Sequence, residues 1–174
     1  AFTTIDNSEL YHQTKIYTGT GSTLSVTLDG SEDMQPDLIW IKVRNQSSSP
    51  MLQDSVRGTD GTSYRALKPS GDSAESTNSG FLTAIGSDGF TLGTNGKFNA
   101  SSDTYAAWCW KAGTTSGITT NGSTDITPSA YSINSTAKFS ILNYVGSGTK
   151  GDSVAHGLGV KPDVIWIKRR DAAS

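Results

Sequence analysis

The sequence predicts an all-β fold, an antiparallel β-sandwich or jelly-roll-like module of short strands with long loops. Three observations favour this class. The chain has 19 glycines and only 17% charged residues, and serine and threonine fill many polar positions, which suits short strands joined by tight turns. Several segments alternate apolar and polar residues with a period of two, as half-buried strands do. Turn-forming Gly, Asp and Pro residues separate these segments.

The chain changes character after residue 14. Residues 1–14 are polar and have no strong period, so we expect them to form an N-terminal arm or docking segment. Alternation begins at residue 15. In residues 23–28 it places three apolar side chains on one face of a predicted strand: Leu24, Val26 and Leu28.

The nine-residue segment PDLIWIKVR, at residues 36–44, predicts a strand that follows a proline. Alternation assigns one face to the core, with Ile39, Ile41 and Val43. The opposite face is mixed and suits a partly covered surface where basic side chains lie along an indole ring; its residues are Leu38, Trp40, Lys42 and Arg44.

Four further strand regions are expected downstream. They are a short strand in residues 51–58, a hairpin in 81–93 around the turn Asp88-Gly89, a strand in 104–113 and another that starts in 138–148. Residues 104–113, TYAAWCWKAG, are the most apolar of these and predict a central strand covered on both sides, with Tyr105, Ala107 and Cys109 on one face.

Two regions rich in turn-forming residues separate the predicted strands. Residues 59–80 are expected to make a long surface excursion, with one short strand or turn at residues 64–67. Residues 114–137 are expected to act as a linker.

The segment PDLIWIKVR recurs as PDVIWIKRR at residues 162–170, with seven of nine positions identical. Each copy follows a Tyr-x-Gly-x-Gly motif, which begins at Tyr17 and again at Tyr144. The period is about 126 residues, and the order of motifs is the same in both copies. The repeat therefore predicts one full module at residues 15–137, followed by the start of a second copy at residues 138–174.

Two interpretations of the incomplete second copy are open. In the first, the native chain continues past Ser174 with more of the same module. In the second, the strands of residues 138–174 pair with the early strands and complete the first module as a single sheet.

The order of these motifs resembles a repeat module of bacteriophage structural proteins. The motifs are Tyr-x-Gly-x-Gly, Pro-Asp-x-x-Trp-Ile-Lys-x-Arg, DSVRG at residue 54, SDGFTLG at residue 87 and YAAWCWKAG at residue 105. HGLGVKPDVIWIK, at residues 156–168, is especially similar to the segment that opens each copy of that module. The first copy departs from the pattern, because DGSEDM stands where HGLG would be expected.

The resemblance, to tail-fibre-like and other virion proteins of marine and environmental phages, implies a non-enzymatic virion structural protein. We expect a fibre or appendage component that is made in the host cytoplasm and anchored to the particle through its N-terminal part. Its expected partners are other virion proteins and further copies of itself, as a homo-oligomer and most simply a trimer, because small β modules leave edge strands exposed.

Charge and composition argue against several other classes. The net charge of −2, with scattered Lys and Arg, provides no basic face for a nucleic acid. No apolar run approaches the roughly 18 residues that a membrane-spanning helix needs, and the N-terminus does not have the pattern of a signal peptide. Cys109 is the only cysteine, so no intrachain disulfide can form.

The sequence singles out no catalytic, metal or cofactor residues. His12 and His156 are the only histidines, both are expected to be structural, and no Gly-x-Ser-x-Gly motif is present. Residues 29–33 hold three carboxylates but lack the spacing of a calcium loop, and residues 146–153 lack that of a phosphate-binding loop.

Four residues are candidate contacts with a glycan or with a neighbouring module: Trp40, Trp166, Lys42 and Arg44. The same Trp occurs in both copies of the repeated segment, which suits packing between modules. The alternative is a carbohydrate-binding module that recognises host surface glycans through Trp40 or through residues 59–80.

Overall fold

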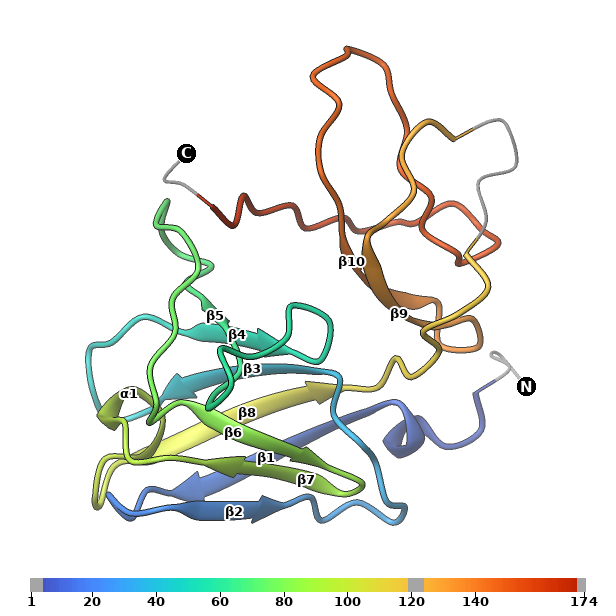
Figure 1. The fold of residues 1–174 in the computed structure, drawn as a ribbon. Helices are drawn as coiled ribbons and strands as arrows, with labels where there is room; N and C mark the ends of the chain where they lie inside the picture. Colours follow the sequence, from blue (N-terminus) through green and yellow to red (C-terminus); the bar gives the residue numbers. More distant parts are fainter. Residues whose placement is uncertain (1–4, 119–123, 172–174) are drawn as a thin grey trace.

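Two antiparallel sheets lie face to face in the computed structural model, which describes residues 5–118 and 124–171 (Figure 1). The larger sheet has the order β1-β8-β3-β4-β5 and the smaller has the order β2-β7-β6, while β9 and β10 form a separate hairpin. The elements are η1 (Ser8–Leu10), β1 (His12–Thr18), β2 (Leu24–Thr27), β3 (Leu38–Val43), β4 (Met51–Asp54), β5 (Ala66–Leu67), β6 (Leu82–Gly86), β7 (Gly89–Leu92), α1 (Gly96–Asn99), β8 (Thr104–Trp110), β9 (Ala130–Asn134) and β10 (Phe139–Asn143).

The core lies between the two sheets, and both contribute alternate residues to it. Ile39 and Ile41 of β3 face it, as do Phe90 and Leu92 of β7, and all four are at most 3% exposed. The short helix α1 adds Phe98, whose ring meets Phe81 edge to face with the centroids 5.0 Å apart. The predicted all-β sandwich is therefore confirmed.

The strands with the clearest alternation are those that the structure confirms. β2 and β3 present the predicted apolar residues to the core. β6 and β7 form the predicted hairpin; its turn is Ser87-Asp88, and Gly89, with φ of 130°, is the first residue of β7. β8 is central, because it pairs with β1 on one edge and β3 on the other, and Tyr105, Ala107 and Cys109 on its inner face are 0% exposed.

Within residues 59–80, β5 lies where a short strand or turn was predicted at residues 64–67; it pairs with β4 and buries Ala66. Two segments differ from the prediction. Residues 114–137 are more than a linker, since they contain β9, which pairs with β10 and buries Ser132 and Ile133. β1 begins at His12, inside the segment assigned to the arm. In each case the strand is short or polar, so pairing with a neighbour defines it more than alternation does.

The Tyr-x-Gly-x-Gly motif, which begins in the last residues of β1, packs against the segment that leads from α1 into β8. The Tyr17 hydroxyl donates to the Phe98 carbonyl oxygen at 2.7 Å, and its ring stacks on Tyr105 with the centroids 5.0 Å apart. A Cβ atom on Gly19 would lie 2.2 Å from the Ala100 carbonyl oxygen, so no other residue fits there.

Asp37, at the start of the repeated segment, joins three parts of the larger sheet. Its carboxylate, on a residue only 2% exposed, accepts hydrogen bonds from the Ser55 hydroxyl and the Ala112 N–H, both at 2.8 Å. Its own N–H donates to the Trp110 carbonyl oxygen at 2.8 Å. One side chain thus links the start of β3 to the turn after β4 and to the end of β8.

The two copies of the repeated segment offer a matched pair of variants. Asp37→Ala leaves the Ser55 and Ala112 donors buried without an acceptor, so we expect the free energy of unfolding to fall by about 2–4 kcal/mol. Asp163→Ala, at the equivalent exposed position, should leave it unchanged within error. Urea unfolding of both variants measures the difference, and equal midpoints would contradict the assigned role of Asp37.

Candidate functional site

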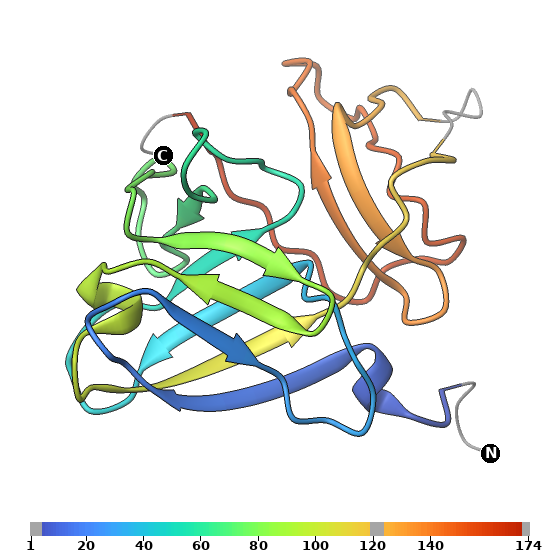
Figure 2. The same ribbon diagram turned by 60° about the horizontal axis from the view of Figure 1, so that its bottom comes forward.

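The second copy of the repeated segment is not a strand, contrary to the prediction. Residues 162–170 run back over the larger sheet, from the hairpin toward the β5 side of the molecule (Figures 1 and 2). Their backbone makes no ladder with another strand among the described residues. Four consecutive side chains, equivalent to buried or half-buried residues of β3, are 64–74% exposed: Val164, Ile165, Trp166 and Ile167.

The strands of the second copy also do not close the first sheet. β10, the equivalent of β1, pairs with β9, and residues 138–171 contribute no strand to either sandwich sheet. The interpretation in which these residues complete the first module is therefore not the arrangement in this structure. Instead, the second copy lies on the outer face of the larger sheet, away from the core (Figure 1).

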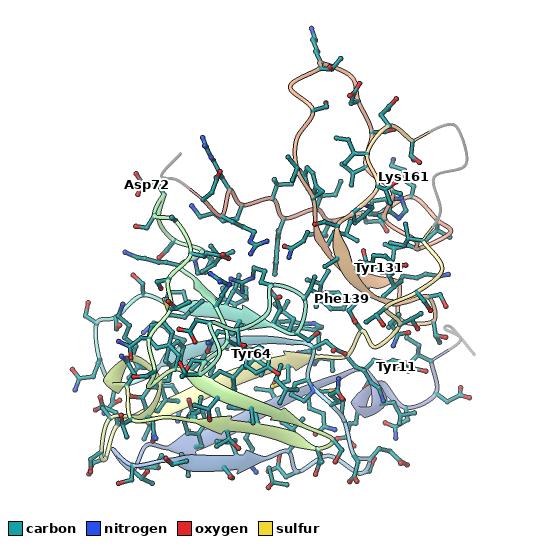
Figure 3. All side chains as sticks on the ribbon, in the orientation of Figure 1. Tyr11, Tyr64, Asp72, Tyr131, Phe139 and Lys161 are labelled. Atoms are coloured by element: carbon teal, nitrogen blue, oxygen red, sulfur yellow. The ribbon has the colours of Figure 1, made fainter. Side chains whose placement is uncertain are left out.

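Aromatic rings fill the contact between the outer face of the sheet and the second copy. Trp40 of β3 meets Trp108 of β8 edge to face, with the ring centroids 6.1 Å apart. Trp166 then meets Trp40 at 88°, with the centroids 5.5 Å apart. Phe139 of β10 lies between the hairpin and the sheet, where its ring stacks on Trp110 at 6.4 Å (Figure 3). These rings bury apolar surface in favourable geometries.

Of the four residues chosen from the sequence, the structure brings the two tryptophans together and directs the two cations elsewhere. The Lys42 ammonium donates to the carbonyl oxygens of Val43 and Gln46. Arg44 is exposed, and its backbone N–H donates to the Thr104 carbonyl oxygen at 2.7 Å. Of these four residues, Trp40 and Trp166 therefore make the contact between the two copies of the repeated segment.

An ion pair holds the far end of the second copy. The Arg170 guanidinium donates two hydrogen bonds to the Glu75 carboxylate, from Nε and Nη2, both at 2.9 Å. The Glu75 N–H donates to the Arg170 carbonyl oxygen, also at 2.9 Å. Two parallel side-chain bonds and one backbone bond fix both the distance and the orientation of the segment.

Two further guanidinium groups surround Glu75, those of Arg65 at 3.4 Å and Arg57 at 3.8 Å. Arg57 is 8% exposed and is itself paired with Asp54 at 2.6 Å. Burial raises the pKa of the Glu75 carboxyl, but the hydrogen bond and charge of Arg170 and the charges of Arg57 and Arg65 together lower it more. The pKa of Glu75 therefore lies below its ordinary value of 4.5.

The sequence pointed to only part of this contact. Arg170 belongs to the repeated segment, and Asp54 and Arg57 belong to the motif DSVRG, so their repetition or grouping was a usable signal. Glu75 lies in the least patterned region of the chain, and nothing in the sequence distinguished it from the other acidic residues there.

A cleft of about 440 Å³ lies between the start of the repeated segment and β9, lined in part by Gln35, Asp37, Ser55 and Tyr131. The Asp37 carboxylate in this cleft already has partners within the protein, because one oxygen accepts a hydrogen bond from Ser55 and the other from Ala112. The cleft therefore offers a ligand hydroxyl groups and amides in place of an unpaired charge.

The remaining candidates for chemistry have structural surroundings. The His12 ring packs on Trp110 at 4.9 Å, and burial lowers its pKa. Nδ1 of His156 accepts the Leu158 N–H at 3.2 Å. Burial raises the pKa of the Cys109 thiol to about 12, which keeps it protonated and unreactive.

Metal and membrane sites were searched over residues 5–118 and 124–171. Within those ranges, no three His, Cys, Asp or Glu side chains converge on a common point. The same part of the chain contains no helix of the length and apolar character needed to span a bilayer.

Comparison with known families matched residues 7–174 to a domain of unknown function, DUF7483. The chain belongs to this family. No curated protein and no solved structure matches it. The DUF7483 match begins at Asn7 and runs through both copies of the repeated segment, so the family unit includes η1, the start of β1 and the second copy.

The Glu75–Arg170 pair predicts a pH-dependent attachment. Because the folded pKa of Glu75 lies below 4.5, the ion pair stabilises the docked segment above that pH and is lost as the pH falls through the folded pKa. The NMR signal of the Arg170 Nε–H should therefore shift with a midpoint below pH 4.5.

Glu75→Gln should abolish that transition and, at pH 8, raise the rate of trypsin cleavage at residues 168–170 several-fold. The control is Asp72→Asn, in the same loop (Figure 3), which should behave as wild type. Unchanged cleavage in Glu75→Gln would show that the ion pair does not hold the segment.

Proposed function

We propose that this DUF7483 protein is a non-enzymatic structural component of a bacteriophage particle, a fibre or appendage protein built from β modules in series. The N-terminal part would anchor it, and its partners would be other virion proteins and further copies of itself. The resemblance of the motifs to phage virion modules supports the assignment to a phage particle. The contact between the two copies of the repeat supports a structural role.

The observation that carries the proposal is the docking of one copy on the other. Trp40 and Trp166 occupy the same position in the repeat and contact each other directly. The Arg170 end is held separately by the bidentate pair with Glu75. A chain that holds the start of a second copy against the first module at separate points has the design expected of an extended structural protein.

Buried polar residues in the first module support the same reading, because their bonds hold the fold together. Asp37 links β3 to the ends of β4 and β8. The Asn99 amide oxygen accepts the Thr20 N–H at 2.7 Å, and its amide nitrogen donates to the Gly93 carbonyl oxygen at 2.8 Å. Such groups stabilise a scaffold and are already committed to neighbours.

Mass spectrometry of purified phage particles tests the proposal. We expect the chain in the particles at a constant copy number, with a native mass by light scattering of three times the 18.3 kDa of this chain, or of the full product if that is longer. The infected-cell lysate is the control for expression. Presence in the lysate together with absence from the particles would refute a virion role.

One observation favours the alternative of glycan recognition. Trp166 is 64% exposed beside Trp40, and exposed indole faces are suited to stacking on sugar rings. If host polysaccharide binds there, Trp166→Ala should weaken binding at least tenfold in a calorimetric titration, while the neighbouring Val164→Ala should not. Binding that is absent in wild type, or equal in both variants, would rule out this site.

A further inference from the structure

We propose that the second copy is an acceptor for a β-strand, and that its occupant is a segment of the α1–β8 type. This inference deepens the proposed function, since such a segment would complete a second module in series with the first, but its test needs only the purified chain. It rests on three parts of the repeat whose counterparts in the first copy each have a partner in one segment, residues 96–112.

The repeated segment itself gives the first argument. In the first copy, β3 has hydrogen-bonded neighbours on both edges: β8 over Leu38–Val43 and β4 over Leu38–Ile41. In the second copy, residues 162–170 carry nearly the same sequence, but no strand of the described chain pairs with them. Exposed extended backbone with apolar side chains is a template for strand addition.

The Tyr-x-Gly-x-Gly motif gives the second argument. In the first copy, the Tyr17 hydroxyl bonds to Phe98, and Gly19 has no room for a side chain because Ala100 lies against it. In the second copy, Tyr144 is 37% exposed, and nothing lies within 4 Å of a Cβ atom built on Gly146. The second copy thus keeps both residues without the α1 segment that they contact in the first.

The repeated aspartate gives the third argument. Asp37 accepts the Ala112 N–H through its side chain, and its own N–H donates to Trp110, so two of its bonds are made to the end of β8. Asp163 occupies the same position and is exposed. An incoming strand with the sequence of β8 would supply both of these partners.

The orientation of the docked segment leaves its acceptor side open. Trp40 faces away from the sandwich core while Ile39 and Ile41 face into it. In the second copy, Trp166 contacts the first module, and Ile165 and Ile167 are 67% and 74% exposed. The side that would face the core of a second sandwich is therefore the free side.

The pairing of β10 also favours a β8-type strand as the occupant. β8 lies between β1 and β3 in the first module. β10 and residues 162–170 are the equivalents of β1 and β3, and β10 uses one edge for β9 while its other edge has no partner among the described strands. A β8-type strand is the element that separates these two neighbours in the complete module.

The test is to titrate the full chain with a synthetic peptide of residues 95–113 that carries Cys109→Ser, and to follow amide hydrogen exchange. We expect exchange at residues 164–168 to slow at least tenfold at saturation, while the amides of β3 are unchanged. A peptide of the same composition in permuted order is the control and should give no protection.

Two variants of the full chain sharpen the result. Asp163→Ala should raise the Kd of the peptide at least fivefold, because the acceptor for the Ala112 N–H is lost. Asp33→Ala, an exposed acidic residue in the turn before β3, should leave the Kd unchanged.

Three outcomes would overturn the proposal. They are absence of protection at millimolar peptide, equal protection by the permuted peptide, and protection that appears without peptide as the protein concentration rises. The last would mean that two copies of residues 162–170 pair with each other. Absence of the protein from phage particles would count against the proposed function alone and leave this result standing.

Discussion

Double-sided pairing of β8 is the constraint on which the rest of the structure depends. Its backbone bonds to β1 on one edge and to β3 on the other, and its inner face is fully buried. A buried strand must have partners for its backbone groups, so the positions of β1 and β3 follow from it. The segment before β8 packs against Tyr17 and Gly19. The segment after β8 is held by Asp37, which accepts the Ala112 N–H.

The same constraint explains why nearly identical segments have different structures. Residues 36–44 and 162–170 share seven of nine residues, yet only the first forms a strand. Strand propensity describes how well a residue fits a pleated and half-buried surface, and that surface is provided by neighbouring strands. The first copy has β4 and β8 beside it, whereas the second has the aromatic outer face of a finished sheet and the carboxylate of Glu75.

The sequence predicted those strands whose buried face is visible as alternation of apolar and polar residues within a single segment. Alternation in residues 23–28, 36–44 and 104–113 predicted β2, β3 and β8 with their core faces, and Asp88-Gly89 predicted a hairpin. Repetition also singled out Trp40 and Trp166, whose rings are in contact in the structure. β9 and Glu75 were not predicted: β9 is a short strand defined by its pairing with β10, and Glu75 is defined by its ion pair with Arg170, 95 residues away. Single-chain periodicity contains no information about such partners.

Attachment of residues 162–170 at two separate points has a geometric consequence. Trp166 and Arg170 are four residues apart, roughly 13 Å along an extended chain, and each is fixed to a different part of the first module, Trp166 to Trp40 of β3 and Arg170 to Glu75 in the loop after β5. One contact alone would let the segment rotate about that point. Two contacts fix both its rotation and its translation relative to the first module. A rotation and a translation applied again and again generate a screw axis, so the pitch and handedness of any filament with this junction would be set by one indole pair and one carboxylate.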